Sequence, residues 1–247
     1  MNIGKMVRLL PLGDGAVTLQ FGTEVSAEAN ARVLGFCKAL TQAKQRGELP
    51  GVVEWVPAFA AVTVHADDAD EAAAAARDAK LLALAEAAAP LPAAGRRWRL
   101  PACFDASFAP DLAALADARG LSVPQAVGLI TGTALRVYML GFLPGFPYLG
   151  DLPAALEMPR LATPRREVPE RSIAVTGRLC AVYPWSSPGG WHLVGRTPVR
   201  LFDAADDEPA LLAPGDEVVW QPVDAATYDA LDRRAAAGAL TRAELLA

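Results

Sequence analysis

The chain has 247 residues, a hydrophobic content of 53% and a formal net charge of −5, so it can bury one large core or two smaller ones. The acidic balance argues against a nucleic-acid partner, and no segment approaches the roughly 20 apolar residues of a transmembrane helix. The N-terminal sequence lacks the apolar core and cleavage site of a signal peptide, so we expect a cytoplasmic protein with no membrane partner.

Three strands are predicted in the first third, at 16–21, where apolar and polar residues alternate, and at 51–56 and 61–65. Between the first two, Ser26 as N-cap and Gly47 as stop signal predict a helix. Asp67 or Asp68 is expected to cap an alanine-rich second helix, and residues 96–103 form the last predicted strand. This β-α-β-β-α-β order is typical of a ferredoxin-like domain.

A connector rich in proline and alanine, residues 90–95, follows the second helix. Such connectors often separate domains, so we expect an N-terminal domain at 1–95 and a C-terminal domain at 96–247. Beyond Cys103, two short helices are predicted at 111–119 and 123–130, and together they have a helix-turn-helix outline. The second of them carries no basic residue, which argues against DNA binding.

The stretch from Gly141 to Arg200 holds nine prolines and seven glycines, which exclude a long helix. A helical tail is predicted from Asp224 onward. We therefore expect the second half to be a β-rich domain with shaped loops, where sites usually lie. Strand-length apolar runs lie at 136–140, 172–175, 180–183, 191–194, 199–202 and 217–221.

The cysteines and histidines are far apart and share no metal-ligand spacing: Cys37, Cys103, Cys180, His65 and His192. We therefore expect buried free thiols and no metal site on this chain. Neither a P-loop nor a G-x-G-x-x-G motif after a strand occurs, so a self-contained nucleotide site of those kinds is not expected.

Two loops carry the first candidate site residues. The segment GFLPGFPYLG interleaves three aromatic residues with prolines and is either a pocket wall or a rigid buried loop; its Tyr148 has a polar group. In the segment SSPGGW, Gly189 and Gly190 either present successive N–H groups to an anion or form a plain tight turn. Ser187 has no G-x-S-x-G setting, which argues against a serine hydrolase.

Arginine side chains are the third candidate group, because a guanidinium binds a carboxylate or phosphate through two hydrogen bonds. Arg165 and Arg196 are favoured, since each lies beside a Thr-Pro pair that would hold it stiffly. A solvated surface charge is the alternative for each. The other arginines considered in this region are Arg160, Arg166, Arg178 and Arg200.

Three long motifs occur in order between residues 136 and 203: RVYMLGFLPGFPYLG, MPRLATPRREVP and SSPGGWHLVGRTPVRLFD. Together they resemble the KipI / allophanate hydrolase subunit 1 family, also described as the B subunit of 5-oxoprolinase and as carboxyltransferase subdomains C and D. The resemblance implies an α+β protein in which a ferredoxin-like N-terminal domain is followed by a cyclophilin-like β-barrel domain.

Members of this family act in the ATP-dependent opening of 5-oxo-L-proline to L-glutamate. The resemblance therefore implies part of a lactam hydrolase that is active only with its partners, the 5-oxoprolinase C subunit in a heteromer and the 5-oxoprolinase A subunit. ATP with Mg would be shared with the partner subunit. Two alternatives stay open: a regulatory protein that inhibits a sensor histidine kinase, or the carboxyltransferase half of a biotin-dependent urea carboxylase-type enzyme.

The enzymatic hypothesis gives each candidate residue a role. Arg165 or Arg196 would hold the substrate carboxylate, and Tyr148 would orient the ring. Gly189 and Gly190 would stabilise a developing negative charge. Ser187 completes the substrate-binding set, and no catalytic acid or base is assigned.

The chain departs from the family at a segment that is typically Gly-x-Gln-Thr-Gly-x-Tyr-Pro. Here residues 177–184 read GRLCAVYP, so Leu179 and Cys180 replace the polar pair and Ala181 replaces the glycine. A ligand that needs those groups would lose about 1–3 kcal/mol for each one left unpaired. If the pair binds substrate in the family, we expect this chain to use another substrate, or none.

Overall fold

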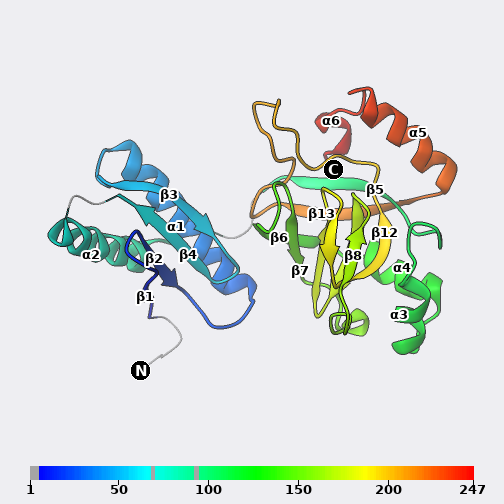
Figure 1. The fold of residues 1–247 in the computed structure, drawn as a ribbon, viewed down its shortest axis with the longest axis horizontal. Coiled ribbons are helices and arrows are strands. Elements are labelled where there is room, and N and C mark those ends of the chain that lie inside the picture. Colours follow the sequence, from blue (N-terminus) through cyan, green and yellow to red (C-terminus); the bar gives the residue numbers. More distant parts are fainter. Residues whose placement is uncertain (1–5, 68–69, 92–94) are drawn as a thin grey trace. The chain divides into compact units, whose positions relative to one another are not determined.

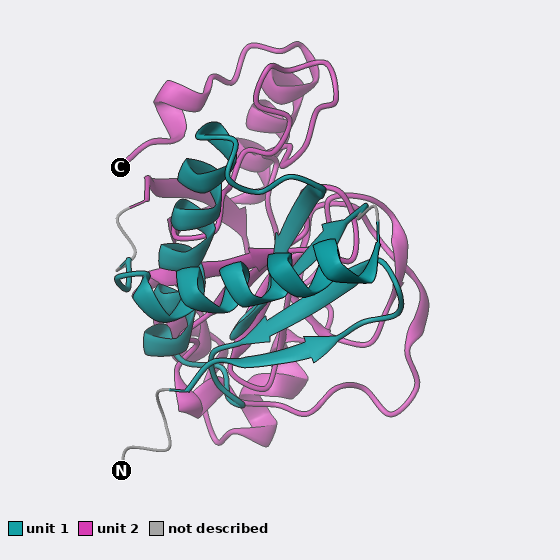
Figure 2. Ribbon diagram, turned by 90° about the vertical axis from the view of Figure 1, so that its left-hand side faces the viewer, with its two compact units in different colours: residues 1–94 teal, residues 95–247 magenta. Residues whose placement is uncertain are grey.

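The computed structural model describes residues 6–67, 70–91 and 95–247, and the chain divides into two units, 1–94 and 95–247 (Figure 2). Each unit has a hydrophobic core of its own. Among the helices in these described ranges, none combines the length and the hydrophobicity that a bilayer span requires.

The first unit is a four-stranded antiparallel sheet with two helices (Figure 1). Its strands pair in the order β1-β2-β4-β3. Leu19 and Val62 of the sheet and Phe36 and Leu40 of the first helix are fully buried in its core. The elements are β1 (Arg8–Pro11), β2 (Ala16–Gln20), α1 (Ala27–Gln45), β3 (Val52–Pro57), β4 (Ala61–Ala66) and α2 (Glu71–Ala87).

The sheet order corrects one expectation for this unit. The strand at Arg97–Cys103, predicted to end a ferredoxin-like β-α-β-β-α-β domain, belongs to the second unit, and the ferredoxin-like assignment is not confirmed. β2, β3, β4 and the two helices keep a split βαβ arrangement, because β4 lies between β2 and β3. The place beside β2 is taken by β1, which reaches it through a tight hairpin in which Gly13 has a φ of 61°.

Polar caps fix where both helices begin. The Ser26 hydroxyl accepts the Ala29 N–H at 3.1 Å, as predicted. In α2 the cap is Asp70, whose carboxylate accepts the Ala73 N–H at 2.8 Å. The predicted cap at Asp67 is therefore wrong, and Asp68 lies outside the described residues.

The second unit contains a closed barrel of seven strands in the order β10-β7-β6-β13-β5-β12-β9 (Figure 1). The chain is thus an α+β protein with a β-barrel, as the resemblance implies. A separate two-stranded sheet pairs β11 with β8. The elements are β5 (Arg97–Cys103), α3 (Leu112–Ala118), α4 (Val123–Thr131), β6 (Leu135–Leu140), β7 (Pro147–Gly150), η2 (Ala154–Leu156), β8 (Arg165–Val168), β9 (Ser172–Thr176), β10 (Leu179–Val182), β11 (Ser187–Gly189), β12 (His192–Arg196), β13 (Glu217–Val223), α5 (Ala225–Ala236) and α6 (Arg242–Leu245).

Three strands of this unit have no predicted counterpart: β7, β8 and β11. Each contains or adjoins proline, which a strand pattern treats as a break. The predicted strand at 199–202 is wrong, because only Phe202 forms a bridge, with Ala210. Its neighbour Leu201 uses its carbonyl to accept the Leu211 N–H at 2.9 Å, so this segment pairs with its own returning loop.

Alternate residues of the barrel strands face opposite sides, which gives this unit two apolar clusters. Ile173 and Val175 of β9 pack in the barrel interior, whereas Ala174 between them belongs to a smaller cluster on the outer side. β10 alternates in the same way, with Cys180 facing inward and Ala181 outward. The candidate site lies at the outer cluster.

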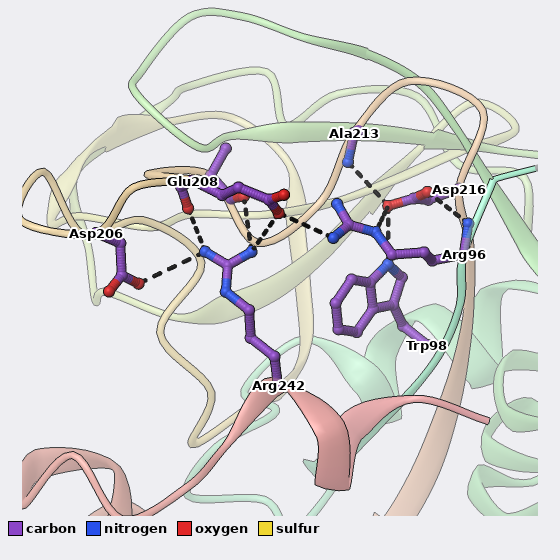
Figure 3. Close-up of polar contacts among 8 residues, drawn as sticks. Arg96, Trp98, Asp206, Glu208, Ala213, Asp216 and Arg242 are labelled. Atoms are coloured by element: carbon purple, nitrogen blue, oxygen red, sulfur yellow. Dashed lines mark hydrogen bonds and ion pairs between the residues drawn. The ribbon is translucent and has the colours of Figure 1, made fainter.

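A buried carboxylate joins the start of β5 to the start of β13 (Figure 3). Asp216 is 3% exposed and accepts the backbone N–H of Arg96 at 2.8 Å and the indole N–H of Trp98 at 2.8 Å. It also accepts the backbone N–H of Ala213 at 3.0 Å. Three donors therefore satisfy this carboxylate where the two strands begin.

Candidate functional site

Aromatic rings from separate segments meet on the outer side of the barrel. We call this group the outer aromatic cluster; its members are Phe146, Tyr148, Tyr183 and Trp191. The Phe146 ring centroid lies 5.1 Å from that of Tyr183, edge to face, and 5.0 Å from that of Tyr148. Tyr148 and Trp191 are 6.0 Å apart. Tyr148 is half-buried and the other three are buried, so Tyr148 is the ring of this cluster that is most open to solvent.

The two phenols of the cluster stay protonated near neutral pH. Burial raises the pKa of Tyr148 and of Tyr183, and the nearby charge of Arg160 only partly opposes this in each case. A hydrogen bond from the Trp191 backbone also favours the ionised form of Tyr183, but less than burial disfavours it. Neither phenol is therefore a general base at neutral pH.

Arg165 lies at this cluster but its guanidinium is already engaged. One Nη donates to Asp111 Oδ1 at 2.6 Å, and the other donates to the Trp191 carbonyl at 3.3 Å. The second oxygen of Asp111 accepts the Leu193 N–H at 2.6 Å. Arg165 thus neutralises a carboxylate of its own chain and joins β8 to β12 through Asp111.

Asp111 is a residue that the sequence analysis did not single out. The pattern places it at the start of a helix, yet its side chain makes no capping hydrogen bond there. The carboxylate instead bonds Arg165 and the backbone of Leu193, which are distant in sequence. No local signal in the sequence distinguishes this use from a helix cap.

The predicted glycine pair does not form an anion-binding nest. A nest needs a left-handed residue, and neither Gly189 nor Gly190 has a positive φ. Gly189 is the last residue of β11, opposite Arg165 of β8, and the Gly190 carbonyl accepts the Leu161 N–H at 2.8 Å. Ser187, in the same strand, has a buried hydroxyl without a hydrogen-bond partner among the described residues.

Arg196 is not brought together with Arg165. It ends β12, four residues after His192, which corresponds to roughly 13 Å of strand at about 3.3 Å per residue. Its Nε donates to the Glu170 carbonyl at 2.9 Å. The two arginines therefore do not form one carboxylate clamp on this chain.

The two residues that replace the family's polar pair face opposite sides of β10. Leu179 packs against the outer cluster, while Cys180 is buried in the barrel interior. Burial raises the pKa of the Cys180 thiol to about 12, so it is not a nucleophile. Of the replaced polar pair, only Leu179 bears on the candidate site; Ala181, which replaces the family glycine, also belongs to the outer cluster.

Arg160 completes the site, although the sequence analysis favours other arginines. Its guanidinium carbon lies over the Trp191 ring at 6.0 Å from the ring centroid. The side chain is exposed. It adds a positive charge beside the half-buried ring of Tyr148.

Three cavities of the second unit lie elsewhere. The first, of about 720 Å³, lies between residues 199–211 and 235–245, another, of about 500 Å³, adjoins it, and a third, of about 570 Å³, lies beside α4. Arg200, one of the arginines considered from the sequence, lines the first two, but none of the favoured site residues lines any of the three. In the first, Arg242 is already paired with Asp206 and Glu208. We therefore place the candidate site at the outer aromatic cluster.

Comparisons with known proteins agree with the motifs. The family model "Carboxyltransferase domain, subdomain C and D" matches residues 7–212. The B subunit of 5-oxoprolinase from Bacillus subtilis (strain 168) is 34% identical over 230 residues, and the alignment covers 89% of this chain and 94% of that protein. The B subunit of 5-oxoprolinase from Escherichia coli O157:H7 is 37% identical over 211 residues, and the alignment covers 85% of this chain and 94% of that protein.

Solved structures share the fold. The crystal structure of TTHA0988 has a TM-score of 0.72 at 34% identity, over 89% of this chain and 40% of that one, so this chain spans less than half of its length. The urea carboxylase of Kluyveromyces lactis has a TM-score of 0.73 at 18% identity, and the match covers 95% of this chain and 23% of that one. This second likeness shows the fold alone.

Proposed function

The chain belongs to the family of the carboxyltransferase domain, subdomain C and D, and on this premise we propose that it is the B subunit of a heteromeric ATP-dependent 5-oxoprolinase. The observation that carries the proposal is the 34% and 37% identity to two 5-oxoprolinase B subunits along 94% of their lengths. Its partners would be the 5-oxoprolinase C subunit, in the same heteromer, and the A subunit.

The reaction would open 5-oxo-L-proline to L-glutamate. Amide resonance makes the lactam carbonyl a poor electrophile. Transfer of the γ-phosphoryl group of ATP to the lactam oxygen, with ADP leaving, activates the carbonyl carbon. Water then adds to that carbon, the ring C–N bond breaks as the nitrogen takes a proton, and a second water hydrolyses the resulting acyl phosphate to glutamate and phosphate. We assign lactam binding to this chain together with the C subunit, and hydrolysis to the A subunit.

The proposed substrate site is the surface formed by Tyr148, Arg165, Ser187, Gly189 and Gly190. A half-buried ring, a cation and an unpaired buried hydroxyl support it, because a lactam acid offers a flat apolar ring and oxygen acceptors. No catalytic acid or base is assigned to these residues. The two glycines would let the substrate approach the backbone closely, but they form no anion-binding nest.

Arg196 remains in the substrate-binding set as a prediction that lacks support from its surroundings. Its Nε is engaged with the Glu170 carbonyl, at the other end of β12 from Trp191. A role in substrate binding would require the partner subunit to bring substrate to that end. Its alanine variant therefore belongs in the functional test.

We propose that this chain and the partner subunit share the ATP site. The arginines of the site suit phosphate oxygens. In the described part of the chain, no group of three or more His, Cys, Asp or Glu could hold a metal ion. The donor set does not fit Mg²⁺, and we derive no step through it on this chain.

The two alternative functions have weaker support. The urea carboxylase likeness at 18% identity shows a shared fold and says nothing of chemistry. A kinase-inhibitor role rests on the resemblance alone. Both predict that the purified heteromer consumes no ATP with 5-oxoproline.

The test is reconstitution of this chain with its C and A subunits. We expect ADP and glutamate to form only when 5-oxoproline and all three proteins are present. Arg165→Ala should lower activity strongly, because it removes both a site cation and the partner of Asp111. If the complete mixture forms no ADP with 5-oxoproline, the proposed function is wrong.

A further inference from the structure

The guanidinium of Arg160 is free to bind an anion. It makes no hydrogen bond or ion pair with any residue in the described part of the chain, and its side chain is exposed. Its guanidinium carbon lies 6.0 Å from the centroid of the Trp191 ring. A cation placed over an indole ring keeps its N–H donors available at its edge.

The backbone on both sides of Arg160 is fixed to the strand connection that carries the outer aromatic cluster. The Pro159 carbonyl bonds Nε2 of His192 at 2.8 Å, and the Leu161 N–H donates to the Gly190 carbonyl at 2.8 Å. These two bonds flank Trp191, the residue beneath the guanidinium. The backbone beside Arg160 is therefore fixed on both sides, while the N–H donors of its guanidinium are not used by these bonds.

Arg165 is less suited to bind a substrate carboxylate. Two of its five N–H donors bond Asp111 and the Trp191 carbonyl, and the carboxylate of Asp111 already pairs with its charge. A substrate carboxylate bound to the same guanidinium would lie beside the negative charge of Asp111. Arg160 has no such competitor among the described residues.

The surroundings of Arg160 match a small ring that carries one carboxylate. The half-buried face of Tyr148 is close enough for the Arg160 charge to act on its phenol. Leu179 packs against the same cluster and adds apolar surface where the family has an amide. A flat lactam ring would contact these apolar groups while its carboxylate faces the guanidinium.

We propose that Arg160, rather than Arg165 or Arg196, binds the carboxylate of the substrate, with the lactam ring against Tyr148 and Leu179. This inference rests on the proposed function and names the residue that selects a lactam acid over a neutral lactam. Arg165 then positions the β8–β12 region through Asp111.

The experiment compares 5-oxoproline with 2-pyrrolidinone, which has the same lactam and no carboxylate. In the reconstituted heteromer, Arg160→Ala should lower kcat/KM for 5-oxoproline about 10- to 100-fold, the usual range for a charge-assisted hydrogen bond, and leave 2-pyrrolidinone unchanged. Arg160→Lys should restore part of the loss. The control is Arg166→Ala, an exposed arginine on the alternate side of β8, which should change neither substrate.

Binding of both lactams to the heteromer without ATP, measured by calorimetry, separates the two proposals. If wild-type heteromer binds 5-oxoproline in preference to 2-pyrrolidinone but forms no product, the proposed function fails and the Arg160 variants still test carboxylate binding. Equal losses for both lactams in Arg160→Ala would overturn the inference. So would an Arg160→Ala heteromer that keeps the wild-type preference, or a wild-type heteromer that binds neither lactam.

Discussion

Two adjacent glycines at the outer aromatic cluster differ in how closely other atoms approach them. A Cβ on Gly189 would lie 2.3 Å from the Tyr183 hydroxyl and 2.7 Å from its ring carbon Cζ, which no rotation of that buried ring relieves. A Cβ on Gly190 would meet Pro164 at 3.6 Å, an ordinary contact. Only Gly189 is required by packing, because its backbone lies against the phenol.

We expect Gly189→Ala to lower the free energy of unfolding by about 1–3 kcal/mol, the usual cost of forcing an extra carbon into a packed site. Gly190→Ala, the matched control, should stay within about 0.5 kcal/mol of the parent protein. Urea unfolding followed by tryptophan fluorescence measures both. Equal effects of the two substitutions would show that the contact with Tyr183 does not restrict this strand.

At the level of elements, polar side chains tie β5, β13 and α6 together (Figure 3). Glu208 forms ion pairs with Arg96, just before β5, at 3.0 Å and with Arg242, the first residue of α6, at 3.3 Å. These pairs are exposed, so solvent and salt screen them. Asp216 differs, because it is buried and one of its donors, the indole N–H of Trp98, is buried as well.

Asp216→Ala should lower the free energy of unfolding by about 2–5 kcal/mol, because it leaves the Trp98 indole N–H and two backbone donors unpaired. Asp216→Asn keeps one acceptor oxygen and should cost less. Glu208→Ala is the exposed control and should leave the denaturant midpoint unchanged. We expect the loss of stability to be largest for Asp216→Ala, smaller for Asp216→Asn and absent for Glu208→Ala. A different order would contradict a stabilising role for the hydrogen bonds that Asp216 accepts.

At the level of the whole molecule, β5 decides where the second unit must begin. It pairs with β13 in parallel along its full length, from Arg97 to Cys103. The Gly95 N–H also donates to the Gly215 carbonyl. The barrel therefore needs the chain from residue 95 onward, close to the start of the predicted domain at 96–247.

A fragment of residues 95–247 should fold alone and unfold in one cooperative transition, whereas residues 105–247, which lack β5, should not fold. The reason is that loss of β5 opens the barrel between β12 and β13 and exposes two strand edges. Circular dichroism and dispersed amide NMR signals distinguish the outcomes. An unfolded 95–247 fragment would argue against the predicted domains 1–95 and 96–247.

The sequence by itself determined the elements whose signals are local. Ser26 as a helix cap, Gly47 as the stop of the same helix and the apolar run at 172–175 could be read because each of these signals lies within a few residues of the chain. Three motifs also determined the family, since they are long and occur in order. The candidate residues at the aromatic cluster followed from those motifs.

Only the tertiary structure decided which of those residues meet. Arg165 and Asp111 are 54 positions apart, and no local pattern could reveal that one neutralises the other. The pairing of β5 with β13 places in the barrel a strand that the β-α-β-β-α-β pattern had assigned to the ferredoxin-like arrangement. The alternation of β10 separated Leu179 from Cys180, although they are neighbours in sequence. The physical reason is common to all three: ion pairing, strand pairing and burial depend on distance in space, and the separation of two residues along the chain does not fix that distance.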